Sequence, residues 1–198
     1  MPEVFIEAVD SGRLRVRTSM YLGRTDPCGE DAGTWYEAYA PDTVFNDRLR
    51  VAGVKIFADG GVCGSLAMSE LFLEGFDIAN PYRHLDALTS MIQRASDAGY
   101  QVIIHDQGDL AIAEVQDACA AMLGGGPNTL RLRIDHNVFP TAETIGRYSE
   151  LDIVPVLFGS SEACRPDLPW TDFYKERGER PGDIVAANPG SCHRVARR

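Results

Sequence analysis

Short apolar runs alternate along the chain with longer amphipathic stretches. Five of these runs have the length and the β-branched or aliphatic content of buried strands: 14–22, 53–58, 101–105, 130–136 and 153–158. Strands that alternate with helical stretches are typical of βαβ units and a parallel sheet. The last run contains Pro155, which favours an edge or distorted strand because proline cannot donate a backbone hydrogen bond. The pattern therefore predicts an α/β fold.

Three amphipathic stretches carry apolar side chains at helical spacing, at about 84–98, 110–123 and 142–151. Gly99 is expected to end the first helix, and Asp109 and Thr141 are expected to cap the other two. Residues 60–81, after the second strand run, are expected to form a long loop. Loops of that length in compact domains are usually functional.

Composition narrows the class of protein. The 198 residues are 44% hydrophobic and 24% charged, as in an ordinary globular domain, and we treat 1–198 as one domain. A net charge of −10 argues against nucleic-acid and membrane partners, and the chain lacks an apolar run long enough to span a membrane. Five scattered cysteines without a CxxC pair predict reduced thiols, a cytoplasmic location and no cysteine zinc cluster.

Lys55 lies inside an apolar strand run, near the end where active sites of α/β sheets are built. A buried ammonium group needs a partner, a shifted pKa or a chemical modification. One interpretation is structural, with the amine reaching water or pairing with Asp59. A functional alternative is a Schiff-base lysine, as in class I aldolase-type barrels.

Two histidines occupy matching positions at the ends of later strand runs. His105 closes a Val-Ile-Ile-His run, and His136 follows the alternating apolar residues of 130–134. Neutral imidazole is the commonest protein ligand for zinc, so the pair favours a metal site, although either histidine alone fits a structural role. The alternation places His136 on the face of those apolar residues, which would turn Arg133 towards the helical layer.

Three aspartates, Asp106, Asp109 and Asp135, lie beside these histidines in the sequence. Carboxylates next to metal-binding imidazoles commonly fix the orientation of the rings. The simpler interpretation, which we favour, is that Asp109 caps a helix and that the other two carboxylates are solvated.

Three ordered motifs, Gly53–Gly60 (GVKIFADG), Ile104–Ala111 (IHDQGDLA) and Arg133–His136 (RIDH), resemble those of amidohydrolase family 3. That family includes N-substituted formamide deformylases and belongs to the metal-dependent amidohydrolase superfamily. The resemblance covers about 10–180 and leaves 181–198 as an unpatterned tail. Over that range the chain resembles an internal fragment of a longer family member.

The resemblance implies a partial (β/α)8 TIM barrel made of strands three to seven. It also implies that Lys55, His105 and His136 bind a divalent metal, zinc, as one or two ions. Lys55 matches a lysine that is carboxylated in many members of the superfamily. The expected reaction is hydrolysis of a non-peptide amide-type C–N bond in a small molecule.

Three departures from the family weaken the expected activity. The first-strand His-x-His pair and the last-strand aspartate of the superfamily have no match here, and Asp106 replaces a small apolar residue. The chain is therefore expected to be inactive or impaired on its own. The alternative is a non-catalytic remnant that acts as an interaction module or a homo-oligomer, closing the open sheet by association.

Overall fold

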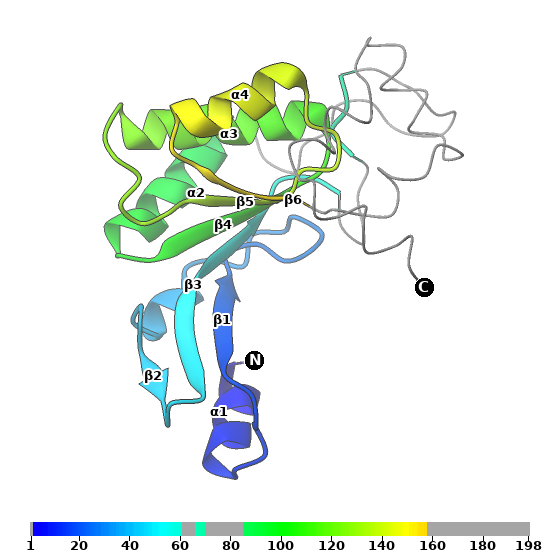
Figure 1. Ribbon diagram of the computed structural model, residues 1–198. Helices are drawn as coiled ribbons and strands as arrows, with labels where there is room; N and C mark the ends of the chain where they lie inside the picture. Colours follow the sequence, from blue (N-terminus) through cyan, green and yellow to red (C-terminus); the bar gives the residue numbers. More distant parts are fainter. Residues whose placement is uncertain (1, 61–65, 70–84, 158–198) are drawn as a thin grey trace, which may run out of the picture.

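The computed structural model describes residues 2–60, 66–69 and 85–157. A single sheet forms its centre (Figure 1). Five strands run parallel in sheet order: β1 (Thr18–Gly23), β3 (Leu49–Phe57), β4 (Gln101–Asp106), β5 (Arg133–His136) and β6 (Val154–Leu157). A short β2 (Val44–Phe45) pairs antiparallel with the start of β3.

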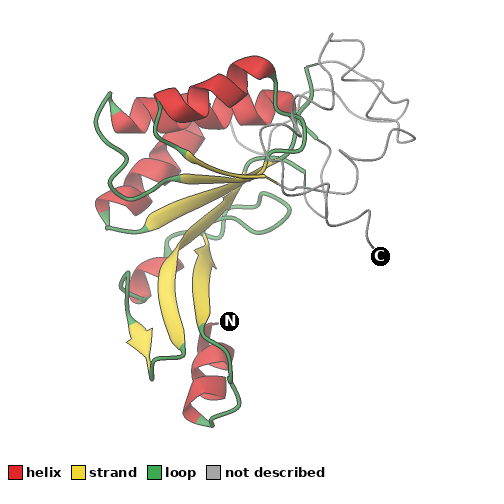
Figure 2. Ribbon diagram, in the orientation of Figure 1, coloured by secondary structure: helices red, strands yellow, loops and turns green. Residues whose placement is uncertain are grey.

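Helices connect the later strands in the order that a parallel sheet requires. They are α2 (Leu85–Asp97), α3 (Asp109–Leu123) and α4 (Ala142–Glu150). Figure 2 shows all three on one face of the sheet, whereas α1 (Pro2–Asp10) lies beside the amino end of β1. Each strand is adjacent to the next parallel strand in the chain, and the sheet is not closed within the described residues. The predicted α/β class, a partial barrel, is confirmed.

The core lies between the sheet and these helices. Alternate residues of β3, β4 and β5, together with Leu132 just before β5, point towards the helices and have no exposed surface: Val54, Ile56, Val102, Ile104, Leu132 and Ile134. They pack against apolar side chains of α2 and α3, among them Leu88, Ile92 and Val115. Burying a side chain of this size contributes about 1.5–3 kcal/mol. The period-two pattern of the strands thus fixes which face the helices cover.

The predicted helices are confirmed, with ends within about one residue of the expected positions. Gly99 follows α2 with φ +86°, a left-handed conformation that favours glycine. Thr141 caps α4 through a capping box, in which its hydroxyl accepts from the Thr144 amide and the Thr144 hydroxyl accepts from the Thr141 amide.

Two strands begin later than their apolar runs. Before β1, the Leu14 amide donates to the Ala8 carbonyl and closes the end of α1, so 14–17 do not join the sheet. Before β5, Arg131 has φ +56° and the Asn128 side chain accepts from the Leu132 amide at 2.7 Å. Both runs are apolar enough for a strand, but local turns end the pairing.

One strand is longer than expected. β3 begins at Leu49 because it forms a tight hairpin with β2, and Asn46 and Asp47 have positive φ in the turn. Asn and Asp tolerate this conformation better than most residues. At the other end of the sheet order, Pro155 lies in β6, and no described strand pairs with the outer side of β6.

Three further expectations concern membrane spans, the cysteines and the segments 60–81 and 181–198. None of the described helices is long and apolar enough to cross a membrane. Cys119 is a free, buried thiol, but Cys28 is disulfide-bonded, so the expectation of reduced thiols is wrong for Cys28. Most of the expected loop 60–81 and the tail 181–198 lie outside the described residues.

Candidate functional site

The sheet face turned away from the helices carries polar side chains near the carboxyl ends of the central strands. Phe57 is paired with His105 in the sheet, and His105 with Asp135. Lys55 precedes Phe57 by two residues and therefore points to the same side. Neighbouring parallel strands thus bring together side chains that are about 80 residues apart in the sequence.

Lys55 is anchored by an acidic partner on this face. Its Nζ lies 3.2 Å from Asp135 Oδ2 and 5.2 Å from the centre of the Phe57 ring. Burial lowers the pKa of Lys55, and the charge of Asp135 opposes that shift. The expected alternative partner, Asp59, does not take this role, since its carboxylate accepts hydrogen bonds from the backbone instead.

Asp135 also binds Arg133, two residues earlier on the same strand. Arg133 Nε lies 2.8 Å from Asp135 Oδ1, and its guanidinium lies 5.2 Å from the Tyr21 ring centre. Arg133 therefore points away from the helices, contrary to the sequence prediction. Asp135 is only 13% exposed and is shared by two cations, so the interpretation of a solvated carboxylate is wrong.

The two predicted histidines meet on this same face. The ring centres of His105 and His136 are 4.3 Å apart, and Phe57 covers His105 at 4.8 Å. His105 is 6% exposed, and its Nε2 is buried without a hydrogen-bond partner. This contact links the ends of β4 and β5 directly.

A single backbone angle places His136 there. Strand alternation would direct it to the face of Leu132 and Ile134, as the sequence analysis predicted, and the structure places that face under the helices. His136 instead has φ +88°, which breaks the alternation at the last residue of β5. Its ring therefore contacts His105 on the open face. The prediction that His136 shares the apolar face is wrong.

Both imidazoles are held in the neutral form at pH 7. Burial, followed by the nearby His136 and Lys55, lowers the pKa of His105 to about 3. Burial and Lys55 also lower the pKa of His136. A neutral imidazole has the lone pair that a metal ion needs, so the protonation state fits a ligand role.

Two aspartates, Asp59 after β3 and Asp109 at the start of α3, hold the loops around the site. Asp59 is fully buried and accepts from the backbone amides of Ala67, Gln107 and Gly108 at 2.8–3.0 Å. A Cβ at Gly108 would lie 2.1 Å from the Ala67 carbonyl oxygen, so glycine is required for this contact. These bonds join the end of β3 to the turn that follows β4.

Asp109 holds the same loop by another route. Its carboxylate accepts from the Ser69 amide at 2.8 Å and from the Ser69 hydroxyl at 2.5 Å. The residue before α3 is Gly108, which has no side chain for capping. The expected capping role of Asp109 is therefore wrong, and this carboxylate fixes residues 66–69 instead.

Asp106 points into the core rather than to solvent. Its side chain has no exposed surface, and neither carboxyl oxygen has a hydrogen-bond partner. Burial raises the pKa of Asp106 well above its usual value, with a further contribution from Asp59. The expected solvation of Asp106 is therefore wrong.

Sequence reasoning singled out Lys55, His105 and His136 but missed Phe57 and did not identify Asp135 as the partner of Lys55. Phe57 packs on His105, and Asp135 with Arg133 holds Lys55. The available signal was alternation: Phe57 lies two residues after Lys55, and Asp135 two after Arg133, so each pair shares a face. The cross-strand register that joins these pairs is visible only in the structure.

The donor atoms fit part of a divalent metal site. Two neutral imidazoles lie side by side, and the orphaned His105 Nε2 is the kind of buried nitrogen that a metal would satisfy. In residues 2–60, 66–69 and 85–157, no three His, Cys, Asp or Glu side chains form a complete site. A hollow of about 210 Å³ at the ends of β5 and β6, lined by Asp135 and His136, leaves room beside them.

Comparison with known proteins supports the fold. No protein-family model and no curated protein matches the chain. An uncharacterized metal-dependent hydrolase from Pyrococcus furiosus matches with a TM-score of 0.62 and 23% identity, over 77% of this chain and 31% of that chain. A second, from Pyrococcus horikoshii OT3, matches with a TM-score of 0.63 and 19% identity, over 78% and 30%.

The chain therefore shares its α/β fold with metal-dependent hydrolases. In the described residues of this chain the parallel sheet is open. The chain spans less than a third of the length of these two structures. At these identities the similarity concerns the fold alone.

Proposed function

We propose that this chain carries part of the active site of a metal-dependent hydrolase that cleaves a non-peptide amide-type C–N bond in a small molecule. The observation that carries the proposal is the contact between His105 and His136, 4.3 Å between ring centres at the carboxyl ends of adjacent parallel strands. Active sites of barrel enzymes are built at that end of the strands. The shared fold of the two Pyrococcus hydrolases supports the same class of chemistry.

In this proposal His105, His136 and Lys55 bind a divalent metal, zinc. The bound ion would lower the pKa of a water molecule and polarise the amide carbonyl. The two histidines meet the requirement for neutral ligands because burial lowers their pKa values. Phe57 covers one side of His105 and keeps water from that side of the ring.

Lys55 needs a change of state before it can act as a ligand. An ammonium group has no lone pair, so the amine must lose its proton or become carboxylated, as the family resemblance implies. Burial lowers its pKa and favours the neutral amine. Asp135 and Arg133 then position the side chain at the mouth of the site.

The site as proposed is incomplete within this sequence. The chain has four histidines, no two of which are separated by a single residue, so the first-strand pair of the superfamily is missing. We therefore propose that the 198-residue chain binds metal through its partial ligand set but hydrolyses amides weakly or not at all.

Metal binding tests the proposal directly. The chain is stripped with a chelator and titrated with Zn²⁺ by calorimetry. We expect saturable binding, weakened at least about tenfold by His105→Ala or His136→Ala, because each removes one ligand and loss of an outer-shell partner alone costs about 10- to 100-fold. His84→Ala, which removes a histidine outside the proposed set, serves as the control.

Two outcomes would overturn the assignment. One is a Zn²⁺ affinity that is the same in His105→Ala, His136→Ala and His84→Ala. The other is the absence of binding at micromolar Zn²⁺ together with a defined oligomer in solution, which would favour the non-catalytic interaction module. Hydrolysis of a panel of N-substituted formamides and simple amides then measures how much activity the chain retains.

A further inference from the structure

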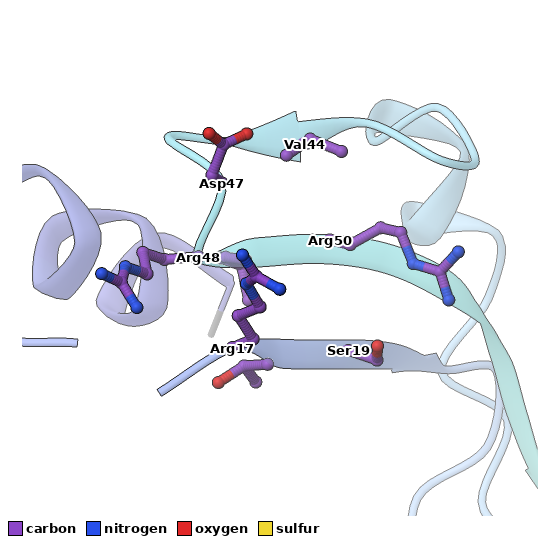
Figure 3. Close-up of a pocket in the computed structure, with 8 residues that line it drawn as sticks. Arg17, Ser19, Val44, Asp47, Arg48 and Arg50 are labelled. Carbon is purple, nitrogen blue, oxygen red and sulfur yellow. The ribbon is translucent and has the colours of Figure 1, made fainter. Parts of the chain in front are cut away.

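A second concave site lies at the opposite ends of the strands. A hollow of about 430 Å³ opens at the amino ends of β1 and β3, next to β2 (Figure 3). Three arginines line it, Arg17, Arg48 and Arg50, together with Ser19 and Val44. Leu49, which lines the hollow, and Lys55 are six residues apart along β3, so the hollow lies about 20 Å from Lys55.

Sheet register places these arginines on one face. Ser19 pairs with Arg50 in the parallel ladder, and Arg17 and Arg48 each lie two residues earlier, so alternation places all four side chains on the same side. On the other side of β3, Val44 pairs with Arg50. Like charges at neighbouring cross-strand positions are destabilising unless something neutralises them.

The protein neutralises these cations poorly. Arg50 reaches Asp42 only at 3.4 Å, and both side chains are more than half exposed. Arg48 donates to the Arg15 carbonyl at 3.3 Å, and the Arg17 side chain has no hydrogen bond or ion pair within the described residues. Asp47, at the edge of the hollow, makes no ion pair with any of them in that part of the chain. A group of cations therefore persists in a chain whose net charge is −10.

We propose that this hollow binds a phosphate-type oxyanion, either free phosphate or the phosphoryl group of a small molecule. Guanidinium groups match the oxygen geometry of phosphate through paired N–H donors, and the Ser19 hydroxyl adds a further donor. The volume falls within the range of small-molecule sites. The assignment is independent of the proposed hydrolase chemistry, because it uses other residues at the other end of the sheet.

Anion titrations test this assignment. The full chain is titrated by calorimetry, at low ionic strength, with inorganic phosphate and with phenyl phosphate, and potassium chloride serves as the blank. We expect saturable binding that weakens about tenfold or more in Arg17→Gln and in Arg48→Gln. Arg131→Gln, which changes an exposed arginine two residues before β5 and outside the hollow, should change the affinity by less than about twofold. Tighter binding of phenyl phosphate identifies a phosphorylated small molecule, and tighter binding of phosphate identifies the free ion.

Thermal unfolding separates binding from folding. Without phosphate, Arg17→Gln should unfold at the same temperature as the wild type or higher, because it removes a like-charge contact. Added phosphate should raise the unfolding temperature of the wild type and Arg131→Gln but not of Arg17→Gln. Arg48→Lys, which keeps the charge but loses the paired donors, should bind with intermediate affinity. No saturable binding up to about 10 mM phosphate, or equal affinity in Arg17→Gln and Arg131→Gln, would overturn the proposal.

Discussion

The two faces of the central sheet have different roles, although successive residues of the same strands contribute side chains to them alternately. On the helix-covered face, side chains such as Ile104 and Ile134 are fully buried among aliphatic neighbours. On the opposite face, His105 and Asp135 from the same two strands contact charged or aromatic groups. Adjacent residues of a strand therefore have different roles because their side chains point to opposite faces of the sheet.

This contrast shows how a small sheet can carry a polar site without losing its core. The helix-covered face supplies stability through apolar burial, which needs no specific partners. The open face tolerates a lysine and an arginine because Asp135 is placed between them. Removing an apolar side chain should therefore reduce stability on one face, and removing a charge should reduce it on the other only if a partner is left behind.

Adjacent isoleucines in β4 give the largest expected effect. Ile104→Ala should lower the free energy of unfolding by about 2–5 kcal/mol, because it leaves a cavity in the core between sheet and helices. Ile103→Ala, on the open face, should cost at least about 1 kcal/mol less, because Ile103 lies outside that cluster and keeps 5% exposure. Urea denaturation measures both. Equal losses would show that the two faces contribute alike.

The pH dependence of stability tests the buried carboxyl group of Asp59, which follows the end of β3. Burial raises the pKa of Asp59 to about 6 from 3.8, so the folded chain keeps a proton that the unfolded chain releases in this range. The contribution of Asp59 is therefore fully present below about pH 4 and is lost as the pH rises to about 6, a change of about 3 kcal/mol.

Unfolding of the wild type and of Asp59→Asn between pH 4 and pH 7 isolates this contribution. The stability difference between the two proteins should change with pH in that window and become constant above it. A difference that is flat across the window would show that Asp59 has its ordinary pKa in the folded chain.

Charge removal on the open face should give the smallest effects, with an asymmetry. Asp135→Asn should destabilise by about 2 kcal/mol, less than for a fully buried pair, because Lys55 and Arg133 lose their shared partner. Lys55→Met should change stability by less than about 1 kcal/mol, since Asp135 keeps Arg133 and the buried ammonium is removed. Chemical denaturation of both variants provides the test. A larger loss of stability for Lys55→Met than for Asp135→Asn would contradict the claim that charge removal on this face is costly only when partners are left behind.

Much of the fold could be predicted from the sequence because hydrophobic periods are local. The three helices between the later strands follow from apolar spacing and from end signals such as Thr141 and Gly99. The start of β5 could not be predicted in this way. Its apolar run continues back to residue 130, but a left-handed conformation at Arg131 interrupts the strand.

The candidate site was only partly accessible to the same reasoning. Lys55 and His105 stand out because they are polar residues in apolar strands. Their partners depend on which strands lie side by side, and Lys55 and Asp135 are 80 residues apart in the chain. The orientation of Arg133 was predicted wrongly because it was inferred from His136, whose backbone does not follow the strand.

The unusual backbone of His136 limits what can replace it. A residue at φ +88° must tolerate a conformation that is costly for most side chains and most costly for β-branched ones. Asparagine would keep the positive φ while removing the imidazole. Valine would favour an extended conformation instead and would displace the residues that follow. A substitution at position 136 must therefore first be compatible with this backbone conformation, and only then does the chemistry of the new side chain matter.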